Sequence, residues 1–251
     1  FTKKNKMKIF AEIGLNHLGD SKKALEIVQE CIKRDIDGIT LQIQPNFYYD
    51  NSKNFRRALS IETYKKISSI VKRKKKLFGL AIMDLKTLEK YKSVKFDFLK
   101  ILSLAFDNTE LIKKAIKTKK KIFISTGFSN IKSIIHLGKK YPNLNFIHTS
   151  LDDKPIDANL SAIQTMKNKT KNKISYGLHS SDHEILLLSV CYLPDSIFFY
   201  IKPTKTYNYP DNEHAISLKN LPKILKLIKI AKLSLGNGIK VKKKIPDWVY
   251  E

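Results

Sequence analysis

Short apolar runs alternate along this chain with longer segments of helical periodicity. Eight of the runs have the composition of buried β-strands: Lys8–Gly14, Gly38–Ile43, Leu77–Met83, Phe98–Leu102, Lys121–Ser125, Asn145–His148, Ile174–Gly177 and Ser196–Ile201. Strands that alternate with helices predict a parallel sheet built from right-handed βαβ units. Eight such units within 251 residues favour closure into a (β/α)8 TIM barrel over an open doubly wound sheet. No GxGxxG motif follows a strand, so a dinucleotide-binding fold has no support.

The segments between these runs place apolar residues three and four positions apart, as on one face of a helix. The first begins after Asp20 or Ser21, either of which can cap a helix N-terminus. The predicted helices are Ser21–Lys33, Ile61–Lys74, Leu85–Lys92, Asn108–Lys117, Asn130–Lys139, Asp157–Lys167, Glu184–Leu193 and Leu218–Leu233. Two connections, residues 44–60 and 203–217, are long. The first exceeds the usual loop length, and such loops are often functional lids. The second follows the last strand and holds Glu213 and His214.

The length suits one barrel of the usual size, about 250 residues. We expect an N-terminal extension at residues 1–7, the barrel at 8–241 and a basic tail at 242–251. No apolar run approaches the roughly 20 residues that cross a bilayer, and none has the flanks of a signal peptide, so a cytoplasmic protein without a membrane partner is expected. Cys31 and Cys191 lack CxxC spacing and lie in helix-like segments, which predicts two buried thiols.

The net charge of +25 raises the question of a nucleic-acid partner. The lysines are spread along the predicted helices, as at Lys22, Lys65, Lys113 and Lys226, and do not form one stripe. Aromatic residues do not alternate with the basic clusters as a stacking platform for bases requires. We therefore expect no nucleic-acid partner, although a diffuse positive field can attract anionic substrates. A clustered basic face would be the observation that favours a nucleic-acid-binding barrel.

Nearly every predicted strand ends in polar residues, and in a (β/α)8 barrel all strand C-termini open onto the face that carries active sites. The ionisable candidates are Glu12, Asp84 or Asp182, and Lys100, and His183 and His214 could transfer protons or ligate a metal. The hydroxyl candidates are Ser103, Ser125, Thr126, Thr149, Ser150 and Ser181. A lysine with hydroxyls and exposed amides, here beside Gly127, is suited to a phosphate oxyanion. The pattern favours a small-molecule enzyme, and no GxSxG elbow supports a serine triad.

Several short motifs together resemble one family. They are Ala11–Gly19 (AEIGLNHLG), Asp97–Ile101 with Ser103, Ser125-Thr126-Gly127, Thr149-Ser150 with Asp157–Leu160, Ser181-Asp182-His183, Glu213–Leu218 and Leu235–Gly238. In this order they resemble the catalytic barrel of the sialic acid (N-acetylneuraminate) synthases over about residues 8–241. The resemblance implies a (β/α)8 synthase that condenses phosphoenolpyruvate with an N-acylated amino sugar. The products would be a nonulosonic 2-keto sugar acid, for surface-glycan biosynthesis, and phosphate.

The resemblance also implies roles for single residues. Glu12, Lys100 and His183 would be catalytic, and His183 would ligate a divalent metal, Mn²⁺ or Mg²⁺. Lys100, Ser103, Ser125 and Ser181 would bind phosphoenolpyruvate, Gln42 would contact substrate or water, and Ser150 would contact the sugar. Further substrate-binding candidates are Asn16, Asp84, Thr149, Asp182, Lys202, Glu213 and His214. Because the family pairs its barrels, a homodimer is expected.

Departures from the family pattern leave two interpretations open. One departure is Ala81-Ile82-Met83-Asp84, which stands in place of the family's TPFD motif. Thr40 stands where the family has a phosphate-binding lysine, Asp152-Asp153 replaces a Tyr-Pro pair, and Lys202 replaces the second metal-binding histidine. No counterpart of the family's small antifreeze-like domain is found within these residues. In the first interpretation, the chain is a divergent synthase in which the ammonium of Lys202, near His183, replaces the metal. In the second, it is a non-catalytic barrel that serves the same pathway as a partner or ligand-sensing scaffold.

Overall fold

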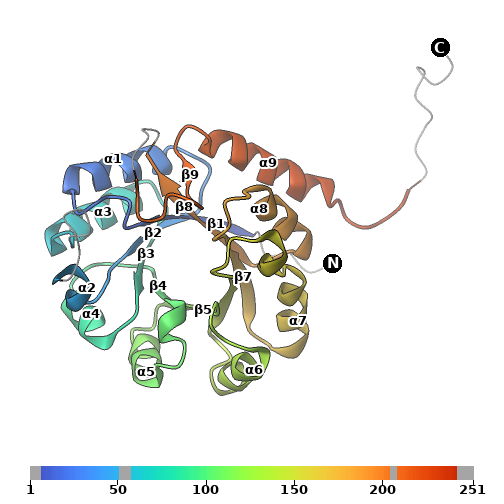
Figure 1. Ribbon diagram of the computed structural model, residues 1–251, viewed down its shortest axis with the longest axis horizontal. Helices are drawn as coiled ribbons and strands as arrows, with labels where there is room; N and C mark the ends of the chain where they lie inside the picture. The colour runs from blue at the N-terminus through green and yellow to red at the C-terminus, as the bar shows by residue number, and fades with distance from the viewer. Residues whose placement is uncertain (1–6, 51–57, 204–207, 242–251) are drawn as a thin grey trace, which may run out of the picture.

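The computed structural model describes residues 7–50, 58–203 and 208–241. In it, eight parallel strands pair in chain order, and the sheet closes because β1 pairs with both β2 and β8 (Figure 1). The strands are β1 (Lys8–Gly14), β2 (Gly38–Gln42), β3 (Leu77–Ile82), β4 (Phe98–Ile101), β5 (Lys121–Ser125), β6 (Asn145–His148), β7 (Lys173–Gly177) and β8 (Ser196–Lys202). The predicted (β/α)8 TIM barrel is confirmed, and no predicted strand boundary differs by more than one residue.

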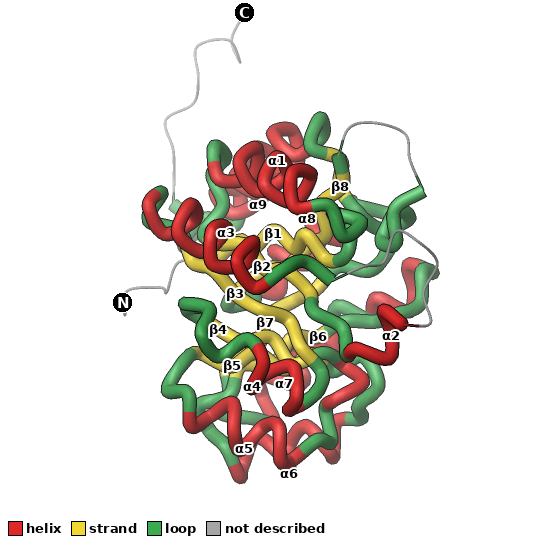
Figure 2. The backbone as a smooth tube through the Cα atoms, turned by 90° about the vertical axis from the view of Figure 1, so that its left-hand side faces the viewer, coloured by secondary structure: helices red, strands yellow, loops and turns green. Residues whose placement is uncertain are grey.

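Helices surround the strands on the outside of the barrel, as the tube in Figure 2 shows. They are α1 (Ser21–Ile32), α2 (Asn46–Asp50), α3 (Ile61–Arg73), α4 (Leu85–Lys90), α5 (Thr109–Lys117), α6 (Ile131–Lys140), α7 (Ser161–Lys169), α8 (Glu184–Ser189) and α9 (Leu221–Ser234). Side chains of Asp20, Ser60, Asp84, Asn108 and Asn130 cap the N-termini of α1, α3, α4, α5 and α6. A two-residue strand, β9 (Ile216–Ser217), pairs with the end of β8.

Two predicted helices are interrupted. The segment predicted as Asp157–Lys167 forms a 3₁₀ turn, η2 (Pro155–Ala158), before α7 begins. The break occurs because Asn159 adopts a left-handed conformation with φ 38°. Likewise, α8 ends at Ser189 and continues as the 3₁₀ turn η3 (Val190–Tyr192). Of the two thiols predicted to be buried, Cys31 is buried in α1 but Cys191 is exposed, because the tighter turn at η3 buries Val190 and leaves Cys191 on the solvent side.

The interior of the barrel is filled by aromatic rings. Phe10, Phe98, Phe123 and Phe198 form a cluster with Ile147, and each of these residues is 1% exposed or less. The rings of Phe10 and Phe198 are stacked with centroids 4.7 Å apart, whereas Phe98 and Phe123 meet edge to face at 5.5 Å. Such arrangements suit the charge distribution of aromatic rings. This layer is an apolar floor beneath the mouth of the barrel.

The same four strands supply the next layer of side chains. Because alternate residues of a strand point to the same side, the residues two positions after the phenylalanines also point into the barrel. These residues are Glu12, Lys100, Ser125 and Tyr200. The period of the strands therefore places a carboxylate, an ammonium, a hydroxyl and a phenol together above the aromatic floor.

No helix in residues 7–50, 58–203 or 208–241 is long and apolar enough to cross a membrane. The predicted N-terminal extension, apart from Met7, and the predicted basic tail lie outside the described residues. So do residues 51–57 and 204–207 of the two long connections.

Candidate active site at the barrel mouth

A buried ion pair occupies the centre of the mouth. Lys100 Nζ donates to both carboxylate oxygens of Glu12, at 2.6 Å and 2.7 Å. Both side chains are only 3% exposed. The hydroxyl of Thr40 donates to Glu12 Oε1 at 3.2 Å, and the ring centroid of Phe198 lies 5.6 Å from Lys100 Nζ. Thr40 therefore supplies a hydrogen bond at the position where the family resemblance implies a second lysine. The buried pair consists of one negative charge, on Glu12, and one positive charge, on Lys100.

Tyr200 borders this pair on the β8 side. Its ring centroid is 5.7 Å from Lys100 Nζ, and its hydroxyl donates to Gln42 Oε1 at 3.3 Å. Burial raises the pKa of Tyr200 well above its ordinary value, and the negative charges of Glu12 and Asp211 raise it further. Tyr200 is therefore a neutral phenol that holds Gln42 at the mouth.

Two histidines pack against the Tyr200 ring. The His179 and His214 ring centroids lie 5.2 Å and 4.9 Å from that of Tyr200, and 4.7 Å from each other. Burial lowers the pKa of His179 well below its ordinary value, and His214 and Lys100 lower it further. Burial also lowers the pKa of His214 to about 4. Both imidazoles are thus neutral near pH 7, and a neutral imidazole can accept a hydrogen bond or a proton.

Lys202, at the end of β8, stands where the family resemblance places the second metal-binding histidine. Its ammonium donates to the backbone oxygen and to Oδ1 of Asn212, at 2.6 Å and 3.0 Å. Burial is the main cause that lowers the pKa of His183 and of His214, and the charge of Lys202 contributes to both shifts. The positive charge of Lys202 therefore acts on both imidazoles, which is consistent with the interpretation of Lys202 in place of a metal.

The mouth does not match the metal site that the family resemblance implies. Nε2 of His183 and Nε2 of His214 are buried without a hydrogen bond to another described residue, so nitrogen donors are present. However, no group of three or more His, Cys, Asp or Glu side chains that could hold a metal ion occurs in the described parts of the chain. A catalytic metal usually has about three protein ligands, and a neighbouring ammonium repels a cation. The described residues therefore do not fit a catalytic divalent metal.

Polar groups of β4, β5 and β6 form the opposite side of the mouth. The backbone N–H of Gly127 donates to Ser103 Oγ at 3.1 Å, and Ser125 is buried at the end of β5. A cavity of about 400 Å³ is lined by Thr126, Gly127, Thr149 and Ser150 together with residues of α6 and α7. The structure thus brings these predicted residues of β5 and β6 to a single cavity rich in hydroxyl groups.

Other predicted site residues are already engaged within the protein. Asn16 donates from Nδ2 to the carbonyl oxygen of Ile201 at 2.8 Å and accepts at Oδ1 from the Asp211 N–H at 3.1 Å. Asp84 accepts from the N–H and the hydroxyl of Thr87, at 2.8 Å and 2.6 Å, and so serves as a helix cap. Asp182 and Glu213 are exposed to solvent.

Ser181 is held by a residue that the sequence analysis treated only as a departure. Asp153 accepts from the Ser181 N–H at 2.7 Å and from its hydroxyl at 3.0 Å. These two hydrogen bonds hold the pKa of Asp153 below its ordinary value. Asp153, in place of the family's Tyr-Pro pair, therefore ties the loop after β6 to the loop after β7.

Tyr200 and His179 were missed by the sequence analysis, although both had a signal. Phe198 and Tyr200 have the same two-residue spacing as Phe10 and Glu12. That spacing predicts that Tyr200 points into the barrel above the aromatic floor. His179 follows the end of β7 by two residues, within the strand-end region that supplied the other candidates.

Comparison with known proteins identifies the family. The sequence model of the NeuB family matches residues 42–240. The chain belongs to the NeuB family. It is 24% identical over 261 residues to the N,N'-diacetyllegionaminic acid synthase of Campylobacter jejuni, covering 92% of this chain and 78% of that protein. The resemblance to sialic acid synthases that the motifs indicated is thereby confirmed.

Solved structures agree with this membership. The crystal structure of N-acetylneuraminic acid (sialic acid) synthetase from Leptospira borgpetersenii matches with a TM-score of 0.84 and 26% identity, covering 95% of this chain and 88% of that one. A DAHP synthase from Thermotoga maritima matches with a TM-score of 0.77 at 12% identity, covering 92% of this chain and 70% of that one, which shows a shared fold alone. The NeuB match begins in β2, so the Ala11–Gly19 motif lies outside it, whereas the structural match spans nearly the whole chain.

Proposed function

We propose that this NeuB-family protein condenses phosphoenolpyruvate with an N-acylated amino sugar to form a 2-keto sugar acid and inorganic phosphate. The observation that carries the proposal is the buried ion pair at the centre of the mouth, in which Lys100 Nζ lies 2.6 Å from Glu12 Oε1. A buried ion pair usually gives no net stability relative to a well-packed apolar pair. Its presence at the face where barrel active sites lie therefore favours a functional role.

Lys100 is the proposed partner for the anionic groups of phosphoenolpyruvate. The hydroxyl groups of Ser103 and Ser125 lie at the neighbouring strand ends and can donate to an oxyanion, and the Gly127 N–H holds Ser103 in place by donating to its Oγ. In the structure, Lys100 is neutralised by Glu12. A bound phosphate would compete for that ammonium, and a carboxylate that loses its cationic partner becomes a stronger base.

The proposed reaction forms one carbon–carbon bond and releases phosphate. Water adds to C2 of phosphoenolpyruvate while C3 bonds to the aldehyde carbon of the sugar, and phosphate then leaves C2. Glu12 would accept the proton that the water loses, and the aldehyde oxygen would gain a proton as it becomes a hydroxyl. The ammonium of Lys202 would stabilise the negative charge on that oxygen, as electrostatic preorganisation requires. This assignment makes the reaction independent of a divalent metal.

The second candidate is the non-catalytic scaffold. It is favoured by the internal hydrogen bonds of Asn16, Asp84 and Ser181, which occupy groups that a substrate would otherwise use. Such a protein could bind an anionic ligand at the mouth without turning it over.

Calorimetric titration of phosphoenolpyruvate, with Mn²⁺ or with EDTA, separates these interpretations. We expect saturable binding in EDTA, and phosphate release when N-acetylmannosamine is added as an acceptor probe. Lys100→Met should weaken binding at least tenfold, because hydrogen bonds to charged groups contribute about 1.5–3 kcal/mol. Lys202→Met should lower the rate of phosphate release more than it weakens binding.

The matched control is Lys86→Met, which removes one charge from an exposed position near the start of α4. It should leave both binding and phosphate release within twofold of the wild type. Binding that requires Mn²⁺ would contradict the role assigned to Lys202. Absence of binding under both conditions, or binding without turnover of any acceptor, would favour the scaffold.

A further inference from the structure

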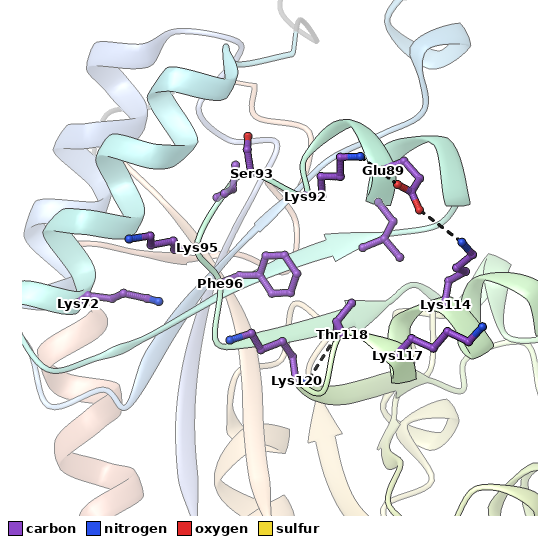
Figure 3. Close-up of a pocket in the computed structure, with 12 residues that line it drawn as sticks. Lys72, Glu89, Lys92, Ser93, Lys95, Phe96, Lys114, Lys117, Thr118 and Lys120 are labelled. Atoms are coloured by element: carbon purple, nitrogen blue, oxygen red, sulfur yellow. Dashed lines mark hydrogen bonds and ion pairs between the residues drawn. The ribbon is translucent and has the colours of Figure 1, made fainter.

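One cavity in the described residues lies at the end of the barrel opposite the mouth. It has a volume of about 600 Å³ (Figure 3). Its walls are the C-terminal ends of α3, α4 and α5 and the segments that lead from α4 into β4 and from α5 into β5. We call it the lysine groove, and its charged lining residues are Lys72, Glu89, Lys92, Lys95, Lys114, Lys117 and Lys120.

The groove has a large excess of positive charge. Glu89 is the carboxylate in the lining, and its oxygens lie 3.7 Å from Lys92 Nζ and 3.9 Å from Lys114 Nζ. Lys72 is paired at 3.2 Å with Asp97, which lies outside the lining. Lys95, Lys117 and Lys120 are exposed and form no ion pair with another described residue. Like charges gathered in this way repel one another, and an anion that bound among them would relieve the repulsion.

Helix electrostatics account for only part of this cluster. Cations in the last turn of a helix interact favourably with the helix dipole, which explains Lys72 in α3 and Lys114 and Lys117 in α5. Lys92, Lys95 and Lys120 lie in the connecting segments beyond the helix ends. Three lysines therefore line the groove at positions that no helix terminus explains.

The floor of the groove is apolar and fixed. Leu88, Val94 and Phe96 lie in the lining, and they are 7%, 3% and 7% exposed. Figure 3 shows the Phe96 ring in the middle of the groove, with lysine side chains drawn around it. The hydroxyl groups of Ser93 and Thr118 also lie in the lining. The volume lies within the range of about 300–1,000 Å³ that is usual for small-molecule sites.

We propose that the lysine groove binds a small ligand with two or more linked phosphate groups, such as a nucleoside triphosphate or an inorganic oligophosphate. A single phosphate would leave most of the lysines unmatched, whereas several linked phosphates can contact Lys95, Lys117 and Lys120 together. The apolar floor beside Phe96 would accept the base of a nucleotide. This site lies apart from the mouth, so it is independent of the proposed synthase activity.

The test titrates orthophosphate, tripolyphosphate and ATP into the full chain at 0.15 M NaCl. We expect tripolyphosphate to bind at a one-to-one ratio, at least tenfold more tightly than orthophosphate. Tighter binding of ATP than of tripolyphosphate would identify a nucleotide as the ligand, and equal affinity would identify the oligophosphate. Equal binding of orthophosphate and tripolyphosphate would overturn the proposal.

A matched pair of variants locates the site. Lys95→Gln/Lys117→Gln/Lys120→Gln removes the three unpaired charges, and Lys22→Gln/Lys65→Gln/Lys226→Gln removes three exposed charges from helix faces elsewhere. Only the first variant should weaken tripolyphosphate binding at least tenfold. Equal losses in both variants would show a diffuse field and overturn the proposal.

Two further measurements exclude other sites and partners. The double variant Glu12→Gln/Lys100→Met, which removes both charges of the buried pair, should leave tripolyphosphate binding unchanged. Loss of binding in this variant, with its fold confirmed by circular dichroism, would place the ligand at the mouth instead. A short DNA duplex should compete weakly for the groove. Duplex binding that is tighter than ATP binding and is lost in the groove variant would show a nucleic-acid surface and overturn the small-ligand assignment.

Discussion

At the mouth of the barrel, Lys100 is 3% exposed and contacts both carboxylate oxygens of Glu12. At the opposite end, six lysines line the lysine groove, and Glu89 supplies the carboxylate among its described lining residues. The first arrangement balances charge locally, because a buried charge without a partner is costly. The second tolerates excess charge, because water and salt screen it. Lysine content alone therefore says little about function. What a lysine does depends on how far it is removed from water.

The largest expected effect comes from breaking the pair at the mouth. Lys100→Met leaves the Glu12 carboxylate buried without a cation, so we expect the free energy of unfolding to fall by about 3–5 kcal/mol. Urea unfolding followed by circular dichroism measures the change. The double variant Glu12→Gln/Lys100→Met should recover most of the loss, because it removes both charges. A double variant as unstable as the single one would show that packing, and not charge, holds this site.

A change of pH should affect the mouth through His214. Burial lowers its pKa from 6.5 to about 4. As the pH falls through 6.5, the unfolded chain binds a proton that the folded chain excludes until about pH 4. Stability from this group is therefore complete above pH 6.5 and declines towards pH 4, by about 3 kcal/mol.

Chemical denaturation at pH 7, 5.5 and 4 checks this expectation. His214→Asn should reduce the slope of stability against pH, whereas His136→Asn, at an exposed position of α6, should not. An unchanged slope in His214→Asn would place the titrating group elsewhere.

The smallest expected effect is at the groove. Glu89→Gln removes a carboxylate that is 51% exposed, and such surface pairs contribute at most about 1 kcal/mol. We expect the free energy of unfolding to change by less than about 0.5 kcal/mol, with the difference fading as salt is raised from 0.05 M to 0.5 M. A loss comparable to that of Lys100→Met would abolish the contrast between the two regions.

The strands were predictable because their pattern is local. A run such as Phe98–Ile101 carries its buried character within four residues, and capping residues such as Asp84 mark the helix that follows. The breaks at Asn159 and Val190 were harder to predict, since each depends on one backbone conformation or a tightened turn. The exposure of Cys191 follows from one of these breaks.

The candidate site was predictable as a set of strand ends but not as a set of contacts. Asn16, Asp84 and Ser181 stand at positions that suggest ligand binding, yet each hydrogen-bonds within the protein. Tyr200 carried a readable signal in its spacing from Phe198, whereas the engagement of Ser181 by Asp153 spans 28 residues and had none. The lysine groove had no sequence signal either, because its lysines come from two separate helices, α3 and α5, and from the segments that follow α4 and α5.

By itself, the sequence determined the barrel, the order of its strands and the end at which polar groups gather, because strand alternation and helix periodicity act over a few residues. Tertiary structure decided which of those groups meet. Glu12 and Lys100 are 88 positions apart in the sequence. The sheet must close into a barrel, with its strands in the observed register, before Lys100 Nζ can lie 2.6 Å from Glu12 Oε1. Burial above the phenylalanine layer then turns that proximity into a charge-balanced site, since both groups are only 3% exposed and little screened by solvent.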